Sequence, residues 1–279
     1  MPRYIDLHVH TTYSDGRDDP GGILRLAREL DLAAVAIADH DNFGAYLEAC
    51  NLLREGDPEL VPAVELSAGQ DGEDIHILGY YFNPKADAFS RAIEGFREKR
   101  NQRGEKMLNK LKDLGIDIPL ELVREIAGDS AIGRPHVADA MVRVKAVGRF
   151  EEAFNKYIGL DGPAYVPKAN LTPREAIRLI HQAEGLAFLA HPGIANAAVH
   201  IDEFTEYGLD GIEVYHSFHN NSTRRRLTKI AEKKGLLKSG GSDYHGRDDR
   251  HGMIGSQPVP LEFLIAMKEK VKLKNRGPR

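Results

Sequence analysis

The sequence has 279 residues, a length that suits one large α/β domain with room for an insertion. Its 42% hydrophobic and 29% charged residues and its formal net charge of −4 exclude a disordered chain and a protein that coats duplex nucleic acid. No basic segment followed by an apolar core opens the chain, and no run approaches the roughly 18 apolar residues of a membrane span. We therefore expect a cytoplasmic protein with no membrane partner.

The first predicted strand, "YIDLHV", carries polar residues in an alternating pattern. Because alternate side chains of a strand point to opposite faces, His8 and His10 should lie on one face and Leu7 and Val9 on the other. Asp15 follows in the turn "TTYSDG". Two imidazoles that point the same way either bind a metal or are two polar groups buried at a cost in free energy. The rest of the sequence is needed to choose between these interpretations.

Short apolar runs then alternate with amphipathic stretches along the first part of the chain. The segments are "PGGILRLARELD", "LAAVAIAD", "NFGAYLEACNLLRE", "ELVPAVEL" and "DIHILGYYF". This alternation of strands and helices predicts a parallel sheet or a barrel built from βα units. Cys50, the single cysteine, excludes an intrachain disulfide and thiolate zinc clusters, and we expect it to be buried in its helix.

The rhythm changes in the middle of the chain, where "DAFSRAIEGFREKRNQRGEKMLNKLKDLG", "PLELVREIAG", "RPHVADAMVRV" and "FEEAFNKYIG" all read as helix. A helical stretch inside an α/β pattern predicts an inserted subdomain. We assign residues 1–85 and 170–279 to the barrel and 86–169 to the insertion, which would form part of the substrate cleft. The alternation resumes at a helix that Thr172 and Pro173 should begin, followed by "LAFLAH", "GLDGIEVYH" and "GLLKSGGSDYH".

Polar residues end most of the predicted strands: His40, Glu65, His191, His216, Asp243 and His245. Barrel enzymes collect their catalytic groups at the C-terminal ends of the strands, so these side chains should converge. His76 lies within its strand and faces opposite to Ile75 and Ile77, which allows it to point to the same place.

A single histidine in a strand usually has a structural role, but nine candidate ligands at the ends or inner faces of strands indicate a metal site. The candidate metal ligands are His8, His10, Asp15, His40, Glu65, His76, His191, Asp243 and His245. Histidine and carboxylate without cysteine favour zinc, manganese or iron. Because each ion takes about three or four protein ligands and a carboxylate can bridge two ions, this set suits two or three metals.

The segments "DLHVHTTYSDG", "ADHDN", "PAVELS", "DIHILGY", "AHPG" and "GGSDYHG" resemble, in order, the motifs of the PHP (polymerase and histidinol phosphatase) family. The resemblance covers residues 1–85 and about 170–255, and it implies a distorted (β/α)7 barrel that holds a trinuclear metal centre. It also implies three ion subsites, formed by His8, His10, Glu65 and Asp243, by Glu65, His76 and His191, and by Asp15, His40 and His245.

The helical insertion resembles that of the subgroup that hydrolyses nucleoside 3′,5′-bisphosphates and trims the 5′ ends of short RNA. The resemblance therefore implies hydrolysis of phosphate monoesters or diesters of nucleotides by a metal-activated water, without a protein nucleophile. Two or three divalent ions are implied as cofactors, manganese foremost, with zinc or iron as alternatives.

The insertion also contains candidate substrate-binding residues. Arg134 and His136 in "IGRPHVAD" flank a proline that can begin a helix, and Lys168 follows at the return to the barrel. His216 has no ligand assignment and could protonate the leaving alcohol, a role that a water on the metals could also fill. A basic helical stretch suits a short single strand of RNA better than a duplex; its residues are Arg97, Lys99, Arg100, Arg103 and Lys106.

Three other functions stay open at this point. A histidinol-phosphatase-like enzyme would act on a small phosphorylated molecule with the same metal centre. A metal-dependent amidohydrolase also begins with a His-x-His strand, but it normally needs a bridging lysine where this chain has Glu65. A non-enzymatic, metal-stabilised module, as in some polymerases, normally lacks several ligands that this chain keeps.

Overall fold

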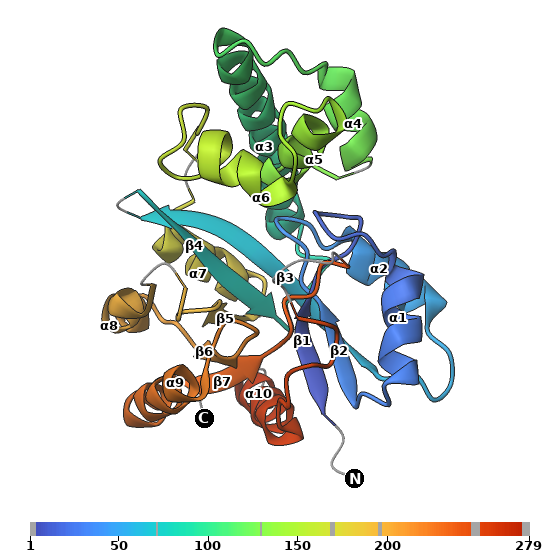
Figure 1. Cartoon of the computed structure of the whole chain (residues 1–279). Helices are drawn as coiled ribbons and strands as arrows, with labels where there is room; N and C mark the ends of the chain where they lie inside the picture. The colour runs from blue at the N-terminus through green and yellow to red at the C-terminus, as the bar shows by residue number, and fades with distance from the viewer. Residues whose placement is uncertain are drawn as a thin grey trace.

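The computed structural model of the chain describes residues 4–70, 72–128, 130–167, 171–194, 197–246 and 252–274. The fold is mixed α/β, with one sheet at its centre (Figure 1). The strands of this sheet follow chain order and curve into a nearly closed barrel. The strands are β1 (Ile5–Val9), β2 (Ala34–Ile37), β3 (Glu59–Gln70), β4 (Glu73–Tyr80), β5 (Leu186–Leu189), β6 (Gly211–Tyr215) and β7 (Leu237–Gly240).

The strand pairing is parallel except around β4. Strands β1 to β3 pair in parallel, as do β5 to β7, whereas β4 is antiparallel to both β3 and β5. The predicted α/β barrel is confirmed, but the expectation that every strand belongs to a parallel βα unit is wrong at β4. The pairing of Gln70 with Glu73 leaves two residues between β3 and β4, too few for the crossover that parallel strands need. A bridge between Val9 and Tyr244, beyond β7, brings the two ends of the sheet together.

Six α-helices pack around the barrel: α1 (Pro20–Glu29), α2 (Gly44–Leu52), α7 (Pro173–Gln182), α8 (Ile201–Glu206), α9 (Asn221–Lys234) and α10 (Leu261–Lys274). The predicted helix start at Thr172 is confirmed, because its hydroxyl accepts the Glu175 N–H and the Glu175 carboxylate accepts the Thr172 N–H. Cys50 lies in α2 as expected, but it is exposed. Ala45 and Ala49 occupy the buried face of that helix, and the residue after Ala49 turns toward solvent.

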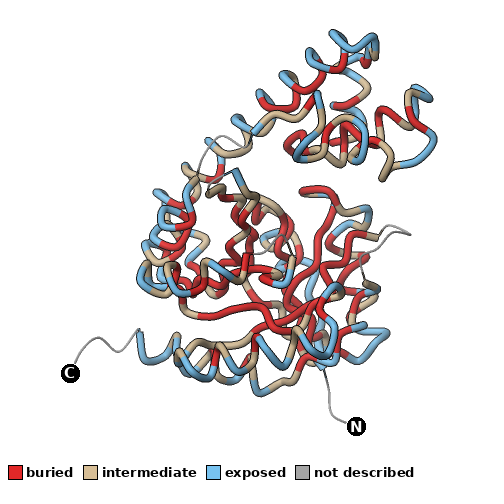
Figure 2. Tube along the Cα trace, turned by 60° about the vertical axis from the view of Figure 1, so that its left-hand side comes forward, coloured by how far each residue is buried: buried red, intermediate tan, exposed pale blue. Residues whose placement is uncertain are grey.

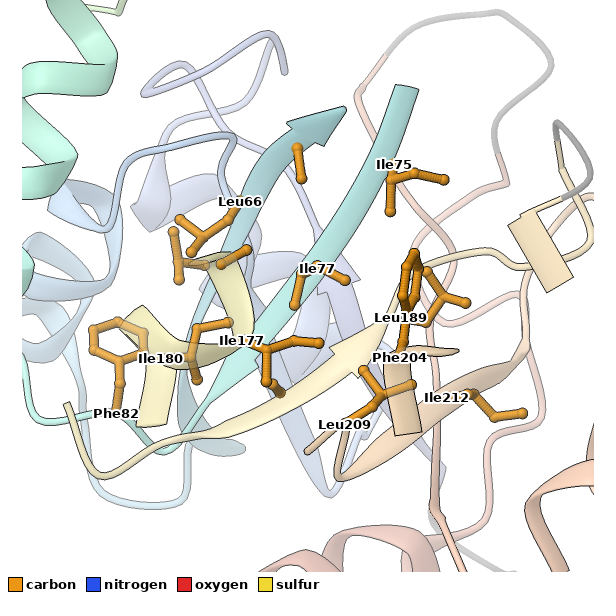
Figure 3. Packing of buried hydrophobic residues seen from close by; sticks show 14 of the residues in the cluster. Leu66, Ile75, Ile77, Phe82, Ile177, Ile180, Leu189, Phe204, Leu209 and Ile212 are labelled. Carbon is orange, nitrogen blue, oxygen red and sulfur yellow. The ribbon is translucent and has the colours of Figure 1, made fainter. Parts of the chain in front are cut away.

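The main hydrophobic core lies between the sheet and helices α7 and α8. Figure 3 shows Ile75, Ile77, Ile177 and Leu189 packed together, and all are fully buried. Figure 2 shows the strands as a buried interior surrounded by partly exposed helices. Since Ile75 and Ile77 face this core, the intervening His76 faces the other side of β4.

A helical segment between β4 and α7 stands over one end of the barrel (Figure 1). It contains α3 (Asp87–Asp113), α4 (Leu120–Ala127), α5 (Arg134–Arg143), α6 (Phe150–Ala153) and a short π-helix (Phe154–Ile158). These helices bury a hydrophobic cluster of their own, which includes Met107, Leu111, Val137 and Met141. We interpret this segment as the inserted subdomain of residues 86–169. No helix in the described part of the chain combines the length and the apolar character needed to cross a membrane.

Candidate metal centre

The two histidines of the first strand point in the same direction, as the strand pattern predicts. Their Nε2 atoms lie 3.2 Å apart, and both side chains are fully buried. Asp243 Oδ1 lies 3.1 Å from Nε2 of His10 and 3.5 Å from Nε2 of His8. Imidazole nitrogens and a carboxylate oxygen therefore face one another at distances that one metal ion could span.

Glu65 lies in the middle of the histidine cluster. The expectation that its strand ends there is wrong, because β3 continues past this residue in its antiparallel pairing with β4. Glu65 Oε1 is 2.9 Å from His76 Nδ1 and 3.1 Å from His191 Nε2. Its Oε2 is 2.9 Å from His40 Nδ1 and 3.4 Å from His10 Nε2. The two oxygens thus face different histidines, which is the geometry expected of a carboxylate that bridges two ions.

Asp15 approaches the cluster from the loop after β1. Its Oδ1 lies 3.4 Å from His245 Nε2, and its Oδ2 lies 3.9 Å from His40 Nε2. The nine candidate ligands therefore meet at one place. Three groups among them have atoms close enough to share an ion: His10, Asp15, His40 and His245; His8, His10 and Asp243; and His40, Glu65 and His76. His10 and His40 each belong to two groups, so the division into ion subsites stays a proposal.

Glu65 and His10 have the protonation states of metal ligands, whereas His245 must first lose a proton. Burial alone would raise the pKa of Glu65, but His40 and His76 hold it well below its ordinary value, so the carboxylate is ionised. Burial lowers the pKa of His10 to about 3, which leaves a neutral imidazole. Burial alone would lower the pKa of His245, but the charges of Asp15 and then Asp243 raise it to about 9, so this imidazole must release a proton when a metal ion binds. Ionised carboxylates and imidazole nitrogens are the donors that zinc, manganese and iron accept, so the residues fit divalent ions.

Asp39 is a buried carboxylate that the sequence analysis did not single out, and it supports the loop that contains Asp15. Asp39 accepts hydrogen bonds from the backbone N–H and hydroxyl of Thr11, at 2.8 and 2.6 Å, and from the hydroxyl of Ser14, which fixes the turn that leads to Asp15. Burial raises the pKa of Asp39 to about 6. Asp39 directly precedes the candidate ligand His40. This position in the sequence is the signal that could have identified Asp39 as a supporting residue.

A cavity of about 630 Å³ opens beside the cluster. One wall contains candidate metal ligands, and another wall, from the helical segment, contains Arg100, Arg103 and Arg134. Arg100 Nη1 donates to Asp41 Oδ2 at 2.9 Å, which ties α3 to the loop that follows His40. The helical segment therefore brings three guanidinium groups to the cavity that also contains the candidate ligands.

The candidate substrate-binding residues occupy different places. Arg134 lines the cavity. His136 is buried, and its Nδ1 accepts the Gly133 N–H at 3.0 Å, so it holds the start of α5. His216 is also buried, with Nε2 3.2 Å from Asp243 Oδ2, and is not among the described residues that line the cavity. Lys168 lies outside the described residues.

Comparison with known proteins is consistent with this geometry. The PHP domain family model matches residues 6–127. The chain is 32% identical to the 5′-3′ exoribonuclease Rnm of Escherichia coli strain K12 over 247 residues, which cover 86% of this chain and 84% of that protein. It is 30% identical over 258 residues to the 3′,5′-nucleoside bisphosphate phosphatase of Chromobacterium violaceum, covering 88% and 90% of the two chains. A candidate metal-dependent phosphoesterase from Bifidobacterium adolescentis has a similar structure, with a TM-score of 0.85, 28% identity and 96% of both chains covered.

Proposed function

Because the chain belongs to the PHP domain family and is a metal-dependent phosphoesterase, we propose that it hydrolyses a nucleotide phosphoester that carries a second phosphate. Nucleoside 3′,5′-bisphosphates and short 5′-phosphorylated RNA share this chemistry. The observation that carries the proposal is the cavity, which has metal-ligating side chains on one wall and arginines on another.

The ions would be held by the nine His, Asp and Glu side chains, in the three subsites that the family resemblance implies. We propose manganese as the metal, with zinc or iron as alternatives that the same donors accept. Such ions would offset the negative charge of the phosphate oxygens and lower the pKa of an attacking water. Glu65 faces histidines on both sides, so it would keep two subsites at a constant distance. His216 would orient Asp243, since its Nε2 lies 3.2 Å from Oδ2 of that carboxylate.

Arg103 is the central residue of the proposed second-phosphate site. It is 8% exposed, and its Nε donates to the Val166 carbonyl at 2.7 Å. Its Nη2 is buried and has no hydrogen-bond partner within the described ranges, and the same holds for Ser67 Oγ, from another residue that lines the cavity. Burial and then the charge of Arg134 lower the pKa of Arg103 to about 10, so it stays charged at neutral pH. Two buried donors without acceptors suit a phosphate, because unpaired buried donors are costly.

Aromatic side chains favour a nucleotide over a small phosphorylated molecule. Phe150, Phe154 and Phe218 line the same cavity as the arginines. Aromatic rings of this kind stack on nucleobases without strong sequence preference. The two curated relatives act, by their names, on RNA and on nucleoside bisphosphates, which supports the same substrate class.

Two enzymatic alternatives predict different behaviour. A histidinol-phosphatase-like enzyme would need only one phosphate, so the arginines of the insertion would not matter for its substrate. An amidohydrolase would need a bridging lysine, but Glu65 occupies the position between the histidines. A substrate comparison therefore separates these functions.

The test compares manganese-loaded protein on adenosine 3′,5′-bisphosphate, a 5′-phosphorylated oligoribonucleotide and p-nitrophenyl phosphate. We expect kcat/KM for at least one of the two-phosphate substrates to exceed that for p-nitrophenyl phosphate by about 100-fold, the scale of one charge-assisted contact. Equal values on all three substrates would contradict the second-phosphate site. Activity on an amide or a lactam but on no phosphoester would contradict the whole proposal.

A further inference from the structure

Glu213, in β6, is a fully buried carboxylate that lies next to the metal centre but outside the proposed ligand set. Its two oxygens have different partners. Oε1 lies 3.0 Å from Nδ1 of His8, and Oε2 accepts the backbone N–H of His191 at 2.7 Å. One carboxylate therefore contacts two candidate ligands that belong to different ion subsites.

The contact with His8 determines which ring nitrogen can bind a metal. When Nδ1–H donates to Glu213, the lone pair is on Nε2. That nitrogen faces the cluster, 3.2 Å from His10 Nε2 and 3.5 Å from Asp243 Oδ1. A hydrogen bond to the ring nitrogen that does not bind the metal commonly orients a metal-ligating histidine and increases its basicity.

The contact with His191 holds a backbone conformation that needs support. His191 has a φ of +30°, a value that residues other than glycine rarely adopt. Its Nε2 lies 3.1 Å from Glu65 Oε1, so a change in its backbone would move the ring away from that carboxylate. His219 supports the same loop, because its Nε2 accepts the Gly193 N–H at 3.0 Å.

We propose that Glu213 is a positioning residue that keeps His8 and His191 at a fixed separation on either side of Glu65. Through this pair of hydrogen bonds it couples two ion subsites, so that its loss weakens metal binding at both. This inference rests on the proposed metal centre, and it assigns a role to a carboxylate that need not touch an ion or the substrate.

The substitution Glu213→Gln tests the inference, because an amide has one acceptor oxygen and cannot accept from both His8 and His191. We expect its manganese affinity, measured by competition with a chelator, to fall by about 10- to 100-fold, the usual effect of removing such a partner. Metal content after dialysis against limiting manganese should fall with it. The readout is metal binding, so it does not depend on turnover. Glu213→Asp keeps both acceptors on a shorter side chain, and it should weaken manganese binding by a smaller factor, which provides a second variant if the glutamine protein does not fold.

Asp210, which precedes the same strand, offers a matched control. Its Oδ2 also accepts from a histidine ring, His181 at 2.7 Å, and from a backbone N–H, Ala187 at 2.9 Å. Asp210→Asn should lower the melting temperature of the metal-free protein and leave manganese affinity unchanged.

Unchanged manganese affinity in Glu213→Gln, or an equal loss of affinity in Asp210→Asn, would overturn the inference while leaving the metal centre in place. Wild-type protein that takes up no manganese, zinc or iron would overturn the metal centre itself, and the role of Glu213 with it.

Discussion

Arg134 Nη2 donates to Asp74 Oδ2 at 2.6 Å, which joins the first residue of α5 to strand β4 two residues before His76. Both side chains are about one-fifth exposed, so the ion pair is partly buried but still accessible from the cavity. The guanidinium has five N–H donors, and one carboxylate leaves several of them for a ligand. Arg134 is thus held by the barrel and presented to the cavity at the same time.

The first prediction concerns this arginine. Arg134→Ala should cost about 2–4 kcal/mol of transition-state binding with adenosine 3′,5′-bisphosphate, the range for truncating one member of a charged pair, which lowers kcat/KM by roughly 30- to 900-fold. A substrate with one phosphate should be affected much less. Arg143→Ala is the matched control, because Arg143 lies on the same helix in an exposed ion pair with Glu125 and should have little effect. Equal losses on both substrates would place Arg134 at the scissile phosphate or in the fold.

The second prediction concerns the loop carboxylate. Asp15 lies 3.4 and 3.9 Å from the nearest nitrogens of His245 and His40, and without it their proposed subsite would keep fewer than the three protein ligands of a usual catalytic site. Asp15→Asn should therefore lose one metal of three and keep the other two. Because the lost ion would stabilise charge on the phosphate, kcat should fall at least about 100-fold. Elemental analysis and kinetics check both effects, and a fully metallated or fully active variant would refute the assignment.

The third prediction concerns the buried ligands around β1. His8→Ala, His10→Ala and Asp243→Ala should each abolish phosphatase activity, since their donor atoms face one another within 3.5 Å. The circular dichroism spectrum of each variant should stay that of a folded α/β protein, because Leu7 and Val9, on the opposite face of β1, keep their packing in the hydrophobic core. Normal turnover with full metal occupancy in Asp243→Ala would show that this carboxylate is not a ligand.

The fourth prediction concerns packing of the helical segment. A glycine within a helix normally costs about 1 kcal/mol relative to alanine. Gly95→Ala should stabilise the protein by up to about that amount, because Gly95 is exposed on α3 and an added Cβ would meet no described atom within 4 Å apart from its own stretch of helix. Gly104→Ala should instead destabilise it by about 1–3 kcal/mol, because the added methyl would overlap with Ile132. Urea unfolding of the two variants measures the difference. A stabilised Gly104→Ala protein would show that this contact can relax.

The fifth prediction concerns pH and Asp210. Burial alone would raise the pKa of Asp210, but the hydrogen bonds from His181 and Ala187 lower it below its ordinary value. A lowered carboxyl pKa stabilises the fold fully above the unfolded-state pKa, about 3.9, and this stabilisation is lost as the pH falls through the lower folded-state pKa. Metal-free Asp210→Asn should therefore be less stable than wild type by about 1–2 kcal/mol at pH 7.

That difference in stability should shrink below about pH 4, where Asp210 becomes protonated in the wild-type protein. Urea unfolding of both proteins at several pH values below about pH 5 measures it. A difference that grows below about pH 4 would show that Asp210 is not the ionised acceptor of these hydrogen bonds.

Much of the metal centre follows from local rules that can be read along the chain. A strand alternates its side chains, so His8 and His10 had to point the same way, and His76 had to face away from Ile75 and Ile77. Parallel strands of a barrel end at one rim, so polar residues at their ends had to meet there. These rules involve only neighbouring residues and the direction of each strand.

Other features depend on how separate elements pack. Contacts between distant segments decide the direction of β4 and the exposure of Cys50 on α2. They also decide which face of α3 lines the cavity, and so place Arg100 and Arg103 there. The role of Glu213 is of this kind, since 205 residues separate it from His8. Strand alternation determined where side chains point, but only the tertiary structure decided which buried carboxylates hold those side chains in place, because a hydrogen-bond partner is chosen by proximity in space.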